Sequence, residues 1–133
     1  MYKNRDRYKF RAWLKNKKRY EYDIENCYED WEYDCFGDYL KDEDSIVEQC
    51  TGLKDVNGEL IYEGDIFTAE VINSFKDDPC LNKIIGGQVA YYANEASFTF
   101  TRYAPINLHN IEIVGNIHEN ADILEKWRVN NND

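Results

Sequence analysis

The sequence lacks any long run of apolar residues, and its longest uninterrupted apolar stretches are only a few residues. A membrane-spanning helix needs about 20 consecutive apolar residues, and a secretory signal peptide needs an apolar core of its own. We therefore expect no transmembrane helix, no signal peptide and no membrane partner. The predicted location is the cytoplasm.

Residues suited to metal binding are few. Four cysteines and two histidines are present: Cys27, Cys35, Cys50, Cys80, His109 and His118. No two cysteines form a C-x-x-C pair, although zinc sites usually contain closely spaced ligands. We predict no metal site and reduced thiols, which are the default in a protein without an export signal.

Catalytic motifs are missing as well. The serines are few, and none lies in a G-x-S-x-G motif: Ser45, Ser74 and Ser97. The pair Gly86-Gly87 lacks the Lys-Ser/Thr of a phosphate-binding loop. We interpret the acids Glu59, Glu63 and Asp65 as turn-stabilising groups rather than as acid–base catalysts or metal ligands. The sequence thus predicts a noncatalytic protein without a cofactor.

The hydrophobic and aromatic content of the chain is sufficient for a folded core. Its 133 residues are 43% hydrophobic and 15% aromatic, which argues against intrinsic disorder despite a net charge of −10. A chain of this length forms one domain, or two small ones, without needing disulfides or metals.

Charge is distributed unevenly along the chain. Residues 1–19 carry a net charge of +8, whereas residues 20–48 carry −11. Clustered cations favour nucleic-acid binding, because they displace counterions from phosphates. Lys3, Arg5 and Arg7 are the candidate nucleic-acid contacts, since they have no evident acidic partner in the sequence.

Residues 3–25 alternate between charged and apolar residues, which predicts a β-hairpin with its turn at residues 16–18. We expect the other basic residues of this segment to be neutralised across the hairpin. The predicted cross-strand pairs are Leu14 with Tyr20, Ala12 with Tyr22, Phe10 with Ile24, Arg11 with Asp23 and Lys9 with Glu25.

The alternation continues in an acidic, aromatic segment. Trp31, Tyr33 and Cys35 alternate with three acids, Asp30, Glu32 and Asp34. Residues on one face of a strand are about 6.6 Å apart, which resembles the spacing of phosphates along a nucleic-acid strand. These carboxylates either keep a strand face soluble or imitate DNA to occupy a nucleic-acid-binding protein.

Turn signals separate several short strands in the second half of the chain. Asn57-Gly58 favours a type I′ turn, and Glu63-Gly64-Asp65 a second turn. We predict a strand with Phe67, Ala69, Val71 and Phe75 on one side, and further strands over residues 88–93, 96–103 and 111–117. Gly115 marks a bulge or a close approach. Short strands joined by tight turns suggest a small barrel.

One helix is predicted, beginning near Asn120 and running through Ile123, Leu124 and Trp127. The expected organisation is an N-terminal antiparallel β region at 1–50, a barrel region at 51–119, and a C-terminal helix and tail at 120–133. The expected fold class is mainly β.

Three segments resemble the YopX family of phage and prophage proteins: YKFRAW at residues 8–13, TGLKDVNGELIYEGDI at residues 51–66 and IEIVGNIHEN at residues 111–120. Their order and spacing agree across nearly the whole chain. The segments around residues 27–44 and 77–83 depart from the family pattern. The resemblance implies an SH3-like barrel component, self-association and a phage-accessory setting in a bacterial host cell, but no activity and no catalytic residues.

The sequence leads us to expect a noncatalytic, oligomeric interaction module that binds a host or phage protein. Tyrosine and tryptophan are enriched at protein interfaces, and the candidate contact residues are Trp31, Tyr33, Tyr91, Tyr92 and Tyr103. An acidic DNA mimic acting through Asp30, Glu32 and Asp34, and nucleic-acid binding through the basic N-terminal stripe, are the alternatives. Nucleic acid ranks behind protein as a partner.

Overall fold

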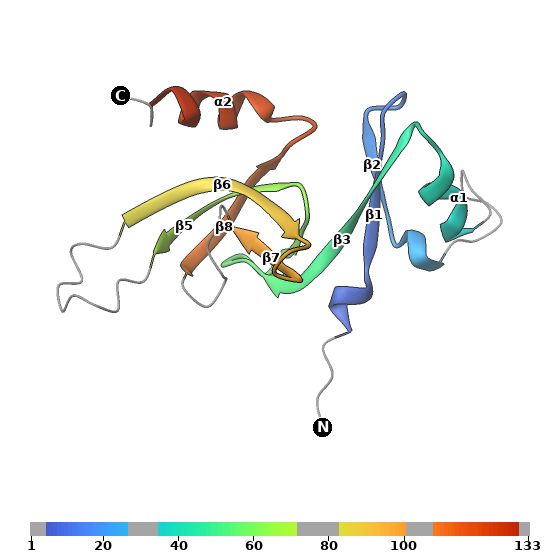
Figure 1. Cartoon of the computed structure of the whole chain (residues 1–133), viewed down its shortest axis with the longest axis horizontal. Helices are drawn as coiled ribbons and strands as arrows, with labels where there is room; N and C mark the ends of the chain where they lie inside the picture. The colour runs from blue at the N-terminus through green and yellow to red at the C-terminus, as the bar shows by residue number, and fades with distance from the viewer. Residues whose placement is uncertain (1–4, 27–34, 72–82, 101–107, 131–133) are drawn as a thin grey trace. The chain divides into compact units, whose positions relative to one another are not determined.

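The computed structural model describes residues 5–26, 35–71, 83–100 and 108–130. Two compact units divide the chain, unit 1 at Met1–Leu53 and unit 2 at Lys54–Asp133. The described residues form eight strands in two four-stranded sheets, with orders β2-β1-β3-β4 and β7-β6-β5-β8 (Figure 1). The prediction of a mainly β protein is therefore confirmed.

Unit 1 is a small sheet with short helical segments. In chain order its elements are η1 (Asp6–Tyr8), β1 (Phe10–Leu14), β2 (Arg19–Tyr22), η2 (Ile24–Asn26), α1 (Phe36–Lys41) and β3 (Ser45–Lys54), where η denotes a 3-10 helix. The central strand β1 is antiparallel to both of its neighbours, β2 and β3. The basic segment that precedes β1 is not a strand, contrary to prediction, because residues 6–8 form a helical turn.

The predicted register of the first hairpin was wrong by one residue. Leu14 pairs with Arg19, Ala12 with Glu21, and Arg11 with Tyr22. The loop contains four residues rather than the predicted three, and Lys18, its last residue, adopts a left-handed conformation (φ 51°). Its N–H donates to the carbonyl of Leu14 at 2.8 Å, which closes a four-residue loop. Tyr20 and Tyr22 consequently lie on the Arg11 face rather than on the Ala12 face.

The same correction removes the predicted ion pairs of the hairpin. Lys9 pairs with Asp6 at 3.4 Å rather than with Glu25. Arg11 pairs with Glu48 on β3 rather than with Asp23. Strand β2 ends at Tyr22, and the 3-10 turn η2 that follows carries Ile24 away from the predicted pairing with Phe10.

A core on the Ala12 face holds unit 1 together. Ala12, Leu14, Ile24 and Tyr39 are fully buried or nearly so, and partly buried Phe10, Phe36 and Val47 pack against them. Glu21 also lies on this face, where the hydroxyl of Tyr39 donates to its carboxylate. This bond explains how the hairpin tolerates an acid on its core side.

Helix α1 was not anticipated from the alternating pattern. Its start is defined by Cys35 and Asp38, whose carboxylate accepts a hydrogen bond from the Cys35 N–H at 3.2 Å. Tyr39 is the buried residue of the helix, and it contacts the unit 1 core together with the partly buried Phe36. The predicted strand through Trp31 and Tyr33 lies outside the described residues.

Unit 2 contains a strongly curled sheet of β5–β8, the short strand β4, which belongs to the other sheet, and one helix. Its elements are β4 (Leu60–Tyr62), β5 (Asp65–Val71), β6 (Lys83–Tyr92), β7 (Ser97–Phe100), β8 (Leu108–Asn116) and α2 (Ala121–Asn130). Figure 1 shows that β6 bends along its length, which gives the sheet the form of a half-barrel. The helix begins directly after Asn120, as predicted.

The unit 2 core lies inside the curl of this sheet. Phe67 and Ala69 of β5 are buried there, and the rings of Phe67 and Phe100 meet edge-on with centroids 5.0 Å apart. The other core residues are Ile61, Val89 and Leu108. The predicted inward face of β5 is confirmed for Phe67, Ala69 and Val71, whereas Phe75 lies outside the described residues.

Gly86 lies within β6 rather than before it, because the strand begins at Lys83 and not at residue 88 as predicted. A β-carbon at Gly86 would lie 2.6 Å from Cζ3 of Trp127 on α2. Glycine is therefore required where the indole ring of the helix packs against the strand.

We expect Gly86→Ala to lower the free energy of unfolding by about 1–3 kcal/mol, because the methyl group forces Trp127 away from the strand. Urea unfolding of Gly86→Ala, Trp127→Ala and the double variant measures the effect. The double variant should be less destabilised than the sum of the two single variants. Additive losses would show that the ring and the glycine do not interact.

Candidate functional site

The structure describes some of the predicted contact residues but not all. Those outside the described residues are Lys3, Asp30, Trp31, Glu32, Tyr33, Asp34 and Tyr103. Arg5 and Arg7 are exposed in unit 1, and Tyr91 and Tyr92 are exposed in unit 2. The DNA-mimic hypothesis rests on acids outside the described residues.

Tyr91 and Tyr92 lie at the end of the β6–β7 hairpin, where they are 49% and 45% exposed. Tyr91 pairs with Phe98, and their rings meet edge-on with centroids 5.3 Å apart. Strand alternation puts both rings on the same face as the core residues Val89 and Phe100. Tyr92, which pairs with Ser97, lies on the opposite face of the hairpin. We call this end of the hairpin, with Tyr91, Tyr92 and Phe98, the hairpin-end surface.

The exposure of this surface follows from strand length. Gln88 is opposite Ile66, and β5 begins at Asp65, so β5 does not reach as far as Tyr91. The end of the β6–β7 hairpin therefore extends beyond β5, its neighbour in the sheet. The sequence indicated the two tyrosines, but it did not indicate Phe98, whose alternation suggested a core residue.

The turn between β6 and β7 is well defined. The N–H of Glu95 donates to the carbonyl of Tyr92 at 3.1 Å, and that of Ala96 donates to Ala93 at 3.2 Å. Ala96 has a positive φ of 50°. Strand β7 is the edge of the sheet in the described part of the chain, and its residues Ser97–Phe100 carry no charge.

The turn between β3 and β4 is built on Asp55. The N–H of Gly58 donates to the carbonyl of Asp55, and Gly58 alone among the turn residues has a positive φ, 81°. The predicted type I′ turn needs positive φ at Asn57 as well, so that prediction was wrong. This geometry is that of a three-residue loop in which a glycine bulge follows a type I turn.

The Asp55 carboxylate binds three backbone N–H groups. Its Oδ1 accepts hydrogen bonds from Asn57 at 2.9 Å and Glu59 at 3.0 Å, and its Oδ2 accepts one from Ile113 of β8 at 3.0 Å. Burial favours the neutral acid, but the bonds from Ile113, Glu59 and Asn57 outweigh it and lower the pKa of Asp55. The side chain thus joins a hairpin turn to the last strand.

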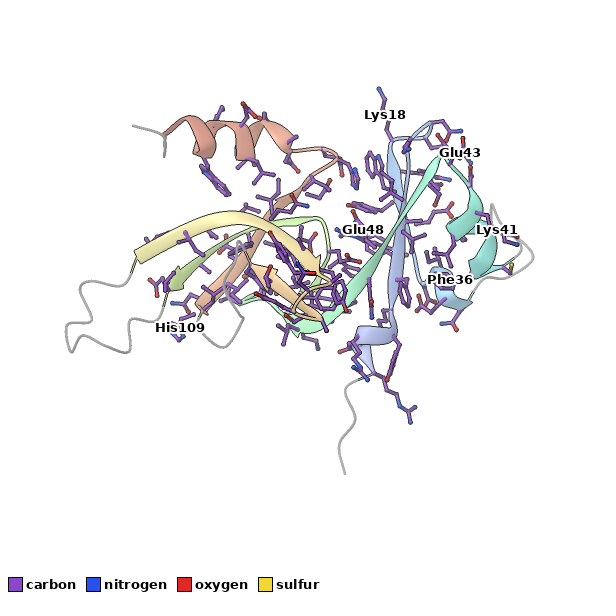
Figure 2. All side chains as sticks on the ribbon, in the orientation of Figure 1. Lys18, Phe36, Lys41, Glu43, Glu48 and His109 are labelled. Carbon is purple, nitrogen blue, oxygen red and sulfur yellow. The ribbon has the colours of Figure 1, made fainter. Side chains whose placement is uncertain are left out.

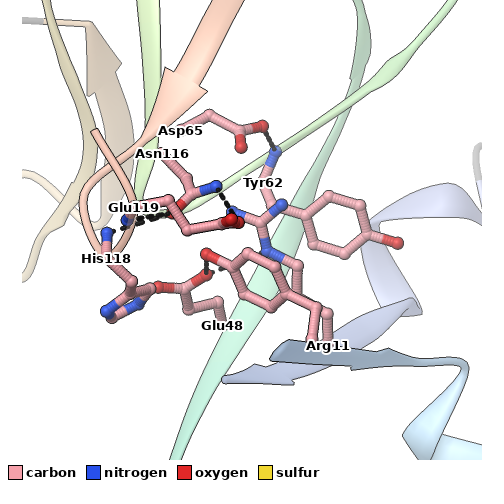
Figure 3. A network of polar contacts seen from close by, with 8 residues as sticks. Arg11, Glu48, Tyr62, Asp65, Asn116, His118 and Glu119 are labelled. Atoms are coloured by element: carbon pink, nitrogen blue, oxygen red, sulfur yellow. Dashed lines mark hydrogen bonds and ion pairs between the residues drawn. The ribbon is translucent and has the colours of Figure 1, made fainter. Parts of the chain in front are cut away.

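The second turn, between β4 and β5, buries another acid. Gly64 adopts a φ of 86°, and its N–H and carbonyl bond to Val89 and Ile117. The Asp65 carboxylate accepts a hydrogen bond from the Tyr62 N–H at 2.8 Å (Figure 3). The interpretation of Asp65 as a turn-stabilising acid is confirmed, and no cluster of three metal-binding side chains occurs among the described residues.

The IEIVGNIHEN segment forms the corner between β8 and α2. The Asn116 Oδ1 accepts hydrogen bonds from the backbone of His118 and Glu119, both at 3.0 Å (Figure 3). A β-carbon at Gly115 would lie 2.5 Å from Oδ1 of Asn120, and the pairing with β5 is irregular at this point. The predicted bulge and close approach at Gly115 are both confirmed.

A buried ion pair lies on the other face of the unit 1 sheet. Arg11 and Glu48 are each 4% exposed, and Nε of Arg11 lies 2.9 Å from Oε1 of Glu48 (Figure 3). The Tyr20 hydroxyl also donates to Glu48, and its ring lies 4.0 Å from the Arg11 guanidinium carbon. Sequence reasoning missed this pair because nothing local links residue 11 to residue 48.

The basic segment before β1 is a compact turn. The N–H of Tyr8 donates to the carbonyl of Arg5, and that of Lys9 donates to Asp6, both at 3.0 Å. The Gln49 side chain donates to the Arg7 carbonyl at 2.8 Å, which attaches the turn to β3. Tyr8 is 56% exposed, and sequence reasoning did not single it out.

No α-helix in the described part of the chain has the length and apolarity to cross a bilayer.

Comparison with known proteins agrees with this architecture. The crystal structure of protein EF1440 from Enterococcus faecalis is similar, with a TM-score of 0.55 and 23% sequence identity. The match covers 87% of this chain and 96% of that chain, and at this identity it establishes the fold alone. No curated protein matches the chain. The family model described as YopX protein matches residues 9–125, which include the Asp55 turn and the β8–α2 corner, and the chain therefore belongs to the YopX family.

Proposed function

We propose that this protein is a noncatalytic phage or prophage accessory protein that acts as an oligomeric interaction module. The observation that carries the proposal is the hairpin-end surface, Tyr91, Tyr92 and Phe98, which leaves three aromatic rings at one end of a rigid hairpin. Aromatic side chains of this kind are enriched at protein interfaces, where they bury a large area.

The neighbouring edge strand supports self-association. Natural edge strands usually carry charged residues or proline that prevent pairing with another chain. Strand β7 has neither, in a protein in which 32% of residues are charged. A two-fold axis beside β7 would bring Phe98 and Tyr91 of one copy next to the same residues of its partner, as an isologous dimer requires.

We expect the double substitution Tyr91→Ser, Tyr92→Ser to weaken self-association by at least about tenfold, because buried tyrosines at interface centres contribute about 2 kcal/mol or more. Size-exclusion chromatography with light scattering measures the mass against 15.8 kDa for one chain. The measured mass of the wild type should exceed that of one chain, and the mass of the variant should shift towards that of one chain.

Ile84→Ser is the matched control. Ile84 is 71% exposed on the same strand but lies at its other end, so its removal should leave the oligomer unchanged. A wild type that stays monomeric at about 10⁻⁴ M, a concentration at which weak contacts are populated, would contradict the oligomeric part of the proposal. So would an oligomer that the tyrosine variant does not disturb.

A further inference from the structure

The 3-10 turn at the start of unit 1 separates its charged residues into two sets. In a 3-10 helix, side chains three residues apart lie one above the other. Asp6 and Lys9 share one side and form an ion pair at 3.4 Å. Arg5 and Tyr8 share the other side, and Arg7 joins them by bonding to Tyr8. One side of the turn is therefore neutralised, and the other is cationic and aromatic.

Arg7 holds the tyrosine ring in position. Its Nη2 donates to the Tyr8 hydroxyl at 2.6 Å, and its guanidinium carbon lies 4.8 Å from the ring centroid. The ring nevertheless remains 56% exposed, more than any other aromatic side chain in the described residues. The guanidinium lies over one face of the ring, so the positive charge is next to the tyrosine and the other face of the ring is the one that a ligand can stack on.

The cations of this side have no acidic partner in the described part of the chain. The ion pairs of neighbouring basic residues are Lys9 with Asp6, Arg11 with Glu48 and Arg19 with Glu21. Arg5 and Arg7 form none with the described carboxylates, as the sequence suggested. Their guanidinium groups are available to phosphate, which guanidinium binds through paired hydrogen bonds.

We propose that Arg5, Arg7 and Tyr8 form a binding site for single-stranded nucleic acid, in which a base stacks on Tyr8 and the arginines contact the flanking phosphates. Stacking on an aromatic side chain combined with backbone contacts by arginine is the usual mode of binding single strands. The backbone bonds of the turn and the Gln49 contact hold these three residues in one turn, and the Arg7–Tyr8 bond keeps two of the side chains together before the ligand arrives.

Single strands fit this site better than duplex does. A base in a duplex is already stacked on its neighbours, so Tyr8 would gain a contact only at the cost of unstacking. An acidic peptide would pair with the arginines but would not need the exposed ring. Dependence of binding on Tyr8 therefore separates a single strand from the other polyanions.

The test is fluorescence anisotropy of the full chain with a labelled single-stranded oligonucleotide of mixed sequence, at about 20 mM salt, where phosphate contacts are least screened. We expect a dissociation constant of about 10⁻⁶ to 10⁻⁴ M. Tyr8→Ala should weaken binding about tenfold, and Tyr8→Phe should retain most of it, because stacking needs the ring alone.

The double variant Arg5→Gln, Arg7→Gln tests the phosphate contacts. For a single strand, each cation lost should reduce the slope of log affinity against log salt by about 0.7, and the pair by about 1.4. Lys18→Asn is the matched control, since Lys18 is an exposed cation at the tip of the β1–β2 hairpin (Figure 2), and asparagine tolerates its left-handed backbone. It should change affinity less than twofold.

Two outcomes would overturn the proposal. One is the absence of binding to single strands at low salt. The other is binding that Tyr8→Ala leaves unchanged, or that is equally strong for duplex, because a general attraction between charges would then explain it. Circular dichroism of each variant shows whether the fold is retained, and Tyr8→Phe provides a folded comparison if Tyr8→Ala proves unstable.

Discussion

Glu48→Leu is expected to lower the free energy of unfolding by about 3–5 kcal/mol. The substitution leaves the Arg11 guanidinium buried without the Glu48 carboxylate, and an uncompensated buried charge is among the costliest changes in a protein interior. It also removes the acceptor of the Tyr20 hydroxyl. Chemical denaturation, followed by far-ultraviolet circular dichroism, measures the loss as a lower denaturant midpoint.

The double variant Arg11→Met, Glu48→Leu separates charge from packing. Replacing a whole buried ion pair by apolar side chains of similar volume is often neutral or stabilising. We therefore expect the double variant to recover most of the stability that Glu48→Leu loses. A loss below about 1 kcal/mol in Glu48→Leu, a value typical of solvated pairs, would show that the pair is exposed to water in solution.

Asp55→Ala is expected to cost about 3 kcal/mol, because three backbone N–H groups lose their acceptor and each net hydrogen bond contributes about 1 kcal/mol. Asp55→Asn should cost less. Its amide oxygen can still accept from Asn57 and Glu59, but its NH₂ group then faces the Ile113 N–H. Urea unfolding of both variants tests this order, and equal losses would show that the bonds from Asn57 and Glu59 contribute nothing.

The Asp55 carboxylate also predicts a dependence of stability on pH. Its pKa is lowered in the folded state, so the unfolded chain binds the proton more readily. The stabilisation is present above the ordinary aspartate pKa of about 3.9 and is lost as pH falls through the lowered folded value. The difference in stability between wild type and Asp55→Asn should therefore shrink under acid conditions.

Glu25 is present in both wild type and Asp55→Asn, so its contribution to the pH dependence of stability cancels in the difference between them. That contribution changes with pH in the opposite direction to the contribution of Asp55. Burial raises the pKa of Glu25, assisted by Asp23 and opposed by hydrogen bonds from the backbone of Glu25 and Phe10. A raised pKa means that this contribution is lost as pH rises. A wild-type to Asp55→Asn difference that stayed constant from neutral pH to about pH 3, below the ordinary aspartate pKa, would contradict the role assigned to Asp55.

The positions of the unit 2 turns were predictable because their signals are local, although the predicted type of the turn at Gly58 was wrong. Gly58 and Gly64 occupy left-handed conformations that glycine adopts without strain, and Gly115 lies where a side chain would collide with Asn120. The inward face of β5 was predictable for a similar reason, since alternating residues of one strand lie on one face whatever their partners are.

The first hairpin was not predictable to the same degree. The alternation of Arg11 with Ala12 suggested that the Arg11 face of β1 is exposed to solvent. Both faces of the strand are in fact buried. The loop has four residues instead of the predicted three and ends on a left-handed lysine, a residue with no strong preference for that conformation. The register was set instead by contacts with Glu48 and Tyr39, which lie far along the chain.

The candidate sites divide in the same way. Composition and order along the chain determined that many aromatic residues and a basic N-terminal segment would be present, because charge and hydrophobicity belong to the residues themselves. Only the tertiary structure decided which of them lie together: Tyr91 and Phe98 pair at the end of the hairpin, beyond the end of β5, and a turn attached to Gln49 holds Arg7 against Tyr8. The accessibility of a side chain depends on where the neighbouring strands and turns of the fold end, and a local sequence pattern does not indicate this.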